Sequence, residues 1–213
     1  MNPEPPEPAA IAETRLLHKL HRAATSLVAE AAERDSSPPA ALVELRDFVV
    51  AALRHHHQSE DDVLWPQLLA ADPTAGAGLS ELSAEHDALD AALDRLAAAS
   101  VPSPQLVLAA TEVRDVVHEH LEREEPVLFP ALAAHMSDLA WATFSGAVIA
   151  SAPPVGAHLN IGFFEQVGTP AELVGVSANL PPALLEAVPA MREQARVTLE
   201  SLGASTLERR TNA

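Results

Sequence analysis

Apolar residues recur at helical spacing in four long blocks before residue 136. Proline-containing stretches such as "RDSSPPA", "ADPTAGAG" and "SVPSP" separate the blocks and predict short turns. Because short connections make consecutive helices antiparallel neighbours, the pattern predicts an all-α protein built on an up-down-up-down four-helix bundle. The expected helices run roughly over residues 12–34, 40–66, 79–99 and 105–130.

The two ends of the chain lack the pattern of the bundle. Residues 1–11 include the acidic, proline-rich "MNPEPPEPAA", which predicts a short disordered lead-in. Residues 12–136 then form the predicted bundle. Residues 137–213 contain apolar stretches in which prolines mark helix starts, but no repeated set of polar residues. We therefore expect a C-terminal helical extension packed on the bundle.

An internal repeat relates the two halves of the bundle. The segment "HHQSEDDVLWPQLLA" from His56 aligns with "HLEREEPVLFPALAA" from His120, with matching His, Glu, Val, Leu, Pro and Ala positions. The preceding helices match more weakly, "HRAATSL" from His21 with "HDALDAAL" from His86. The bundle is therefore predicted to consist of two helical hairpins, each with one His on its first helix and His-x3-Glu on its second.

The repeated His and Glu residues fall on apolar helix faces. At about 100° per residue, His56 and Glu60 lie one turn apart among inward-facing residues, and His120 and Glu124 do the same. An ionised carboxylate is costly to bury unless it is paired or binds a metal, and two facing carboxylates repel each other. No Lys or Arg occupies an inward position of these two segments. A pair of divalent metal ions would supply the missing positive charge.

The other two predicted helices would complete a metal site. Four imidazoles and two carboxylates would then converge on the centre of the bundle. This set of nitrogen and oxygen ligands suits iron, with zinc, manganese and copper as alternatives. Six side chains leave open positions on two ions, which implies a small exogenous ligand. The predicted metal ligands are His21, His56, Glu60, His86, His120 and Glu124.

Composition narrows the function classes. The net charge of −17 argues against nucleic-acid binding, which needs clustered Lys and Arg, and against docking on anionic lipid. The absence of cysteine excludes thiolate ligands and disulfides, and the absence of tyrosine excludes phenolate ligands. We find no apolar run of about 18 residues and no signal-peptide pattern at the N-terminus, so we expect a cytoplasmic protein without membrane partners.

The motifs together resemble those of a known family. The segments "LHRAATSL", "HHHQSEDDVLWP", "EHDAL" and "HLEREEPVLFP" look like the hemerythrin-like, or HHE cation-binding, family of the actinobacterial type, over about residues 14–135. The resemblance implies a non-haem di-iron centre, with two iron ions inside a four-helix bundle, that binds dioxygen or reacts with nitric oxide or peroxide. By motif match it also implies that the six residues named above are the ligands.

The third predicted helix departs from the oxygen-carrying members, which have His-x3-His there. No histidine lies four residues before or after His86, so the site is short of one imidazole. Asp90, Glu85 or a neighbouring histidine, His18 or His57, would complete the shell, and the sequence does not decide between them. A more carboxylate-rich or more open site suits redox chemistry or sensing better than reversible oxygen storage.

Pro126 lies inside the predicted fourth helix. A proline there removes a backbone donor and crowds the carbonyl of Glu122. We therefore expect a kink that re-aims Glu124.

The sequence thus predicts a non-haem di-iron protein that binds or reacts with a small ligand in oxygen or redox sensing or in stress defence. It leaves open whether the protein is a carrier, an enzyme or a sensor, and what its protein partner is. The alternative is an iron-handling or structural zinc-binding helical protein without redox turnover.

Overall fold

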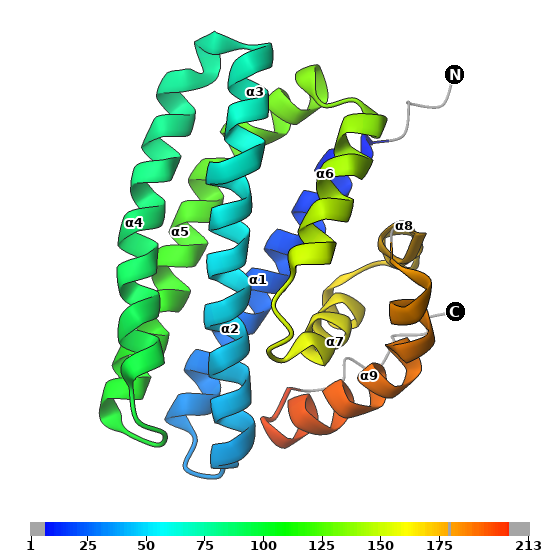
Figure 1. The fold of residues 1–213 in the computed structure, drawn as a ribbon. Coiled ribbons are helices and arrows are strands. Elements are labelled where there is room, and N and C mark those ends of the chain that lie inside the picture. The colour runs from blue at the N-terminus through cyan, green and yellow to red at the C-terminus, as the bar shows by residue number, and fades with distance from the viewer. Residues whose placement is uncertain (1–6, 179, 205–213) are drawn as a thin grey trace, which may run out of the picture.

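The computed structural model describes residues 7–178 and 180–204, apart from the side chain of Ala77, and these residues form helices and turns without a strand. Four long helices lie side by side and alternate in direction (Figure 1). They confirm the all-α class and the four-helix bundle. The four helices are α1 (Ala9–Glu33), α2 (Pro39–Ser59), α4 (Gly76–Ala98) and α5 (Pro104–His135).

The start of the bundle differs from the sequence-based prediction. Residues 1–6 lie outside the described residues, but α1 already begins at Ala9, inside the predicted disordered lead-in. Ile11 is buried in an apolar cluster with Met136, at the end of α5, and Trp141, from the C-terminal part of the chain. Burial of Ile11 against these residues favours helix over disorder, and the sequence pattern of the lead-in alone does not show that contact.

The second helix does not stop at Pro66. It continues from Ser59 through a π-helical segment, Glu60–Leu64, into α3 (Trp65–Ala71), followed by a 3-10 turn (Pro73–Ala75). The amide of Trp65 donates to the carbonyl of Glu60, so the backbone widens by one residue directly before the proline. Because a proline crowds the preceding turn of a regular α-helix, this wider turn lets the helix continue. Single π-turns of this kind are frequent at functional sites.

The fourth helix also continues through its prolines. Pro126 and Pro130 both lie inside α5, which ends at His135 rather than near Pro130. The side chain of Glu124 is fully buried inside the bundle, so Pro126 does not turn it out to solvent. Ser103 caps the other end of α5, where its hydroxyl accepts from the amide of Leu106 at 3.1 Å.

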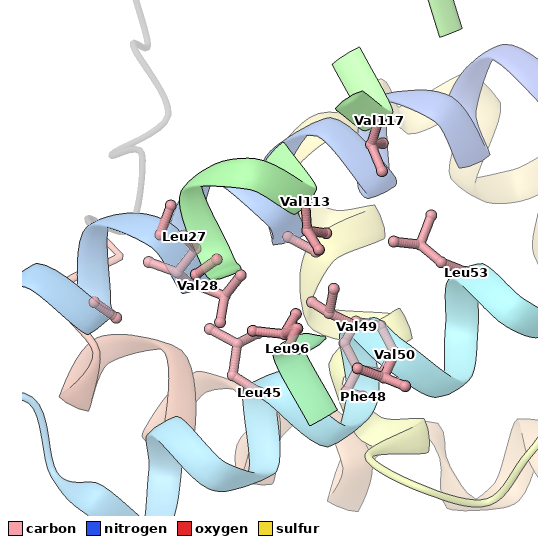
Figure 2. Close-up of a cluster of buried hydrophobic side chains, with 14 of the residues drawn as sticks. Leu27, Val28, Leu45, Phe48, Val49, Val50, Leu53, Leu96, Val113 and Val117 are labelled. Atoms are coloured by element: carbon pink, nitrogen blue, oxygen red, sulfur yellow. The ribbon is translucent and has the colours of Figure 1, made fainter. Parts of the chain in front are cut away.

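Two separate apolar clusters fill the bundle at successive levels along the helices. Figure 2 shows part of the larger cluster, in which aliphatic side chains from four helices interdigitate. On α4, Leu89 belongs to the larger cluster and Leu82 to the smaller one, with His86 between them. The same order holds along α5 and along α2 with its continuation into α3, so one polar layer is enclosed between two apolar ones. The labelled residues of Figure 2 are Leu27, Val28, Leu45, Phe48, Val49, Val50, Leu53, Leu96, Val113 and Val117.

The C-terminal part of the chain packs against one side of the bundle, along α1 and α2 (Figure 1). The Phe163 ring stacks on the Phe48 ring with centroids 5.8 Å apart, which joins this part to the bundle core. Within the described residues, every helix is too short or too polar to cross a bilayer. The helices of this part are α6 (Asp138–Ser151), α7 (Ala157–Val167), α8 (Pro170–Ala178) and α9 (Pro182–Ser201).

Gly156 fixes the approach of α7 to the bundle, and its replacement by alanine is expected to destabilise the protein. It has φ 59°, in the left-handed region, and an added Cβ would lie 2.8 Å from the Phe48 Cβ. We expect Gly156→Ala to lower the free energy of unfolding by about 1–3 kcal/mol. Gly146→Ala in α6 is the matched control, because an added Cβ there meets nothing within 4 Å. Urea unfolding should show no loss for the control, and an equal loss in both variants would refute the argument.

Candidate metal centre

All six metal ligands predicted from the sequence are buried in the polar layer between the two apolar clusters. None is more than 7% exposed, and they come from all four helices of the bundle and from the π-helical segment. Two histidines that the sequence left undecided, His18 and His57, are buried in the same layer. The buried acidic and histidine residues of this layer are His18, His21, His56, His57, Glu60, His86, His120 and Glu124.

Glu60 lies between two imidazoles from different helices. Its Oε1 is 3.6 Å from His56 Nδ1, and its Oε2 is 3.6 Å from His86 Nε2. These separations are longer than a hydrogen bond. Accordingly, Glu60 Oε2 has no hydrogen-bond partner among the described residues.

Glu124 has the corresponding position on the other side. Its Oε2 is 3.6 Å from His18 Nε2 and 3.5 Å from His120 Nε2, and neither of its oxygens has a hydrogen-bond partner among the described residues. The Nε2 atoms of His86 and His120 are 3.3 Å apart. Each carboxylate therefore contacts one imidazole of the pair His18 and His56 and one of the pair His86 and His120.

His18, rather than His21, closes the tightest group. His18, His56, Glu60 and Glu124 offer ligand atoms that all lie within 4.8 Å of one another. His21 packs on the His56 ring with centroids 4.8 Å apart, and no ion pair to a carboxylate is found for it among the described residues. The sequence signal for His18 was its place one turn before His21 on a similar helix face. A ligand role for His21 stays a prediction.

Burial favours the neutral form of four of these imidazoles and disfavours the ionised form of Glu60. Loss of solvation lowers the pKa of His21 and of His56 well below 6.5, and neighbouring histidines lower both further. Burial also lowers the pKa values of His86 and His120. For Glu60, burial and then the neighbouring Glu124 carboxylate raise the pKa well above 4.5.

This arrangement fits bound cations. A neutral imidazole offers the lone pair that a metal needs, and cations between the two carboxylates would remove the penalty of burying them. Arg22 does not supply the charge, because its guanidinium donates to Glu125 on the outer side of the layer at 2.7 Å.

Comparison with known proteins agrees with this geometry. A family model described as the hemerythrin HHE cation binding domain matches residues 11–135, more than half of the chain. The chain belongs to the hemerythrin HHE family. The comparisons with curated proteins and with solved structures gave no match.

Three acidic side chains hold the outer nitrogens of the histidines in this hemerythrin-like domain. The Nδ1 atoms of His86, His120 and His18 lie within hydrogen-bond distance of three carboxylates that come from another helix in each case. When Nδ1 carries the proton and donates a hydrogen bond to the carboxylate, the lone pair of Nε2 points toward the centre of the layer. The pairs are His86 with Asp61 at 2.8 Å, His120 with Glu85 at 2.8 Å and His18 with Glu125 at 3.1 Å.

The sequence-based analysis of the hemerythrin-like domain missed these outer acids, although a signal for them exists. Asp61, Glu85 and Glu125 each stand directly beside a predicted ligand in the sequence. The undecided role of Glu85 is thereby answered, since its contact is with the outer nitrogen of His120.

His57, one of the candidates to complete the shell, is buried inside the hemerythrin-like site. Its ring stacks on His86 with centroids 4.4 Å apart and an interplanar angle of 11°. Its Nδ1 lies 3.3 Å from Asp90 Oδ1, and this hydrogen bond is the main cause of a lowered pKa for Asp90. Asp90, a candidate to complete the shell, therefore lies behind His57, with 52% of its side chain exposed.

Removal of the outer acid behind His18 is expected to weaken metal binding. Hydrogen bonds from His18 and Arg22 lower the pKa of Glu125 to about 2, so its carboxylate is ionised at neutral pH. We expect Glu125→Gln to reduce metal affinity by roughly 10–100-fold. Glu122→Gln, at an exposed position on the same helix, is the control and should keep the affinity. Competition with a chromogenic chelator measures both, and equal affinities would contradict the positioning role.

Proposed function

We propose that this hemerythrin-like protein holds two non-haem iron ions and binds or reacts with dioxygen, nitric oxide or peroxide. The observation that carries the proposal is the shared contact of Glu60 and Glu124 with both imidazole pairs. A carboxylate in such a position can bridge two metal ions, as in other bundles with carboxylate-rich sites. The proposed ligands are His56, Glu60, His86, His120, Glu124 and His18, the last in the place that the sequence gave to His21.

The protein itself contributes position, charge and exclusion of water. The six side chains would hold the ions, and the outer acids fix the proton on the far nitrogen of three imidazoles. The apolar clusters on either side of this layer lower its local dielectric, which strengthens the electrostatic contacts inside it. Iron in this site would supply redox chemistry and open coordination positions for a small ligand.

A role in oxygen or redox sensing or in stress defence in the cytoplasm is consistent with these features. Six ligand side chains on two ions leave open coordination positions, and such an open site supports redox chemistry or sensing over simple oxygen storage. The competing function is a site that holds zinc structurally or handles iron without turnover, because zinc accepts the same ligands.

Metal analysis together with an optical spectrum tests the proposal. We expect about two iron ions per chain and a near-ultraviolet charge-transfer band after exposure to air. Colourless protein with stoichiometric zinc would overturn the redox function. Cycles of deoxygenation and exposure to air then separate the two kinds of activity, since reversible bleaching indicates a carrier or sensor and irreversible oxidation indicates turnover.

A further inference from the structure

A large apolar cavity adjoins the metal centre on the side of the C-terminal helices. Its volume is about 410 Å³, within the range of about 300–1,000 Å³ typical of sites for small organic molecules. Bundle helices α1 and α2 form one wall, and α6–α9 form the other. The wall from α6–α9 includes Trp141, Phe144, Phe164, Leu184 and Met191.

One end of this cavity is polar and belongs to the metal layer. His21, His56 and Glu60 line the cavity, although each is at least nine-tenths buried. The Nε2 atoms of His21 and His56 have no hydrogen-bond partner among the described residues. A buried polar atom without a partner is costly, so a polar group on a bound molecule would stabilise these imidazoles.

The charges around the cavity favour a neutral occupant. None of the lining side chains within the described part of the chain is a lysine or an arginine, so in the metal-free protein an anion would meet carboxylates without a counter-charge. The Glu13 carboxylate accepts from the Trp141 indole at 2.9 Å and from the Ser145 hydroxyl at 3.2 Å. A cationic group at the polar end would face the charge of the proposed metal ions.

We propose that this cavity binds a neutral, largely apolar organic molecule with one hydroxyl or carbonyl group, and that this group lies at His21 beside the metal centre. The apolar body contacts the aromatic and aliphatic wall of α6–α9, and the polar end pairs with the His21 Nε2 atom, which has no hydrogen-bond partner among the described residues. This inference deepens the proposed function by naming a class of organic ligand, and its link to iron rests on that function. The binding itself rests on the cavity alone.

Titration with 1-decanol tests the proposal in metal-free and in metal-loaded full-length protein. Tryptophan fluorescence is a suitable signal, because Trp141 lines the cavity. We expect saturable 1-decanol binding at one site in both forms. In the metal-free protein decanoate should bind at least about tenfold more weakly, because its charge has no partner there. In the loaded protein, decylammonium should also bind more weakly than 1-decanol, and 1-decanol should perturb the optical spectrum of the metal.

Variants that fill the cavity provide the structural control. Ala52→Phe adds a ring from the bundle wall, Met191→Trp adds bulk from the opposite wall, and each should weaken 1-decanol binding by at least about tenfold. Ala147→Phe makes the same change as Ala52→Phe at an exposed position of α6 and should leave binding unchanged. Circular dichroism and metal content confirm folding of each variant.

Three outcomes would overturn the inference. They are the absence of saturable 1-decanol binding, equal affinity of the metal-free protein for decanoate and 1-decanol, and unchanged 1-decanol affinity in both folded cavity-filling variants. Metal analysis tests the proposed function separately from ligand binding. Protein that carries zinc yet binds 1-decanol in this cavity would refute the iron function and support the ligand site.

Discussion

Replacement of Glu60 by glutamine is expected to leave the protein almost without bound metal. Glu60 contacts His56 and His86, one from each imidazole pair, so its loss removes a ligand from both proposed ions at once. A neutral amide also fails to balance the charge of a divalent cation. We expect metal content, measured by mass spectrometry after growth with added iron, to fall from about two ions per chain to a small fraction of that.

Glu81→Gln is the matched control for this experiment. It removes one negative charge from an exposed position of α4 and leaves the polar layer untouched. Its metal content should equal that of the wild type. Iron content that survives in Glu60→Gln would rule out the proposed site.

Glu60→Gln should lower the metal content but raise the stability of the metal-free protein. Because burial and Glu124 raise the pKa of Glu60 above 4.5, its ionised form is disfavoured in the folded state. This group therefore lowers stability as pH rises from about 4.5 through its raised pKa. Metal-free Glu60→Gln does not lose stability through ionisation of this side chain. At pH 7 its free energy of unfolding should therefore exceed that of the metal-free wild type by up to roughly 3 kcal/mol. Urea unfolding of both proteins at pH 5 and pH 8, taken as a difference, isolates this contribution.

Replacement of His18 by alanine is expected to halve the metal content, while the same change at His21 should leave it close to that of the wild type. His18 belongs to the group of four ligands that includes His56, and the pair His86 and His120 remains intact without it. His21 instead lines the cavity and packs on His56. Metal analysis of the two variants side by side measures the difference.

The two histidine variants control for each other, because both remove a buried imidazole from α1 one turn apart. A general loss of packing would therefore affect both alike. A loss of metal in His21→Ala as large as that in His18→Ala would restore the ligand assignment made from the sequence. The metal content of His86→Ala is a further check. It should also fall to about half that of the wild type.

The outer acids show what neighbouring positions in the sequence can predict about the site and what they cannot. Glu85 stands next to His86 in the chain, yet its carboxylate holds the outer nitrogen of His120, which lies 35 residues away on the neighbouring helix. Likewise Asp61, next to Glu60, contacts His86. Proximity in the sequence indicates that an acid lies near the site, but the packing of the helices decides which imidazole it holds.

The sequence by itself determined the bundle and most of its polar layer. Helical spacing of about 100° per residue is a local property, so the inward positions of His56 and Glu60, and of His120 and Glu124, follow from the chain alone. The cost of buried carboxylates without an inward Lys or Arg then pointed to bound cations. The repeat added the symmetry that relates the two hairpins.

Only the tertiary structure brought His18 beside the two carboxylates and created the apolar cavity. His18 and His21 point about 60° apart around α1, and the contact of His18 depends on where α5 places Glu124 against that helix. The cavity arises where α6–α9 cover α1 and α2, and nothing in the spacing of residues 137–213 specifies that contact. The physical reason is the same in both cases, because these features depend on contacts between segments far apart in the chain, and a local pattern carries no information about them.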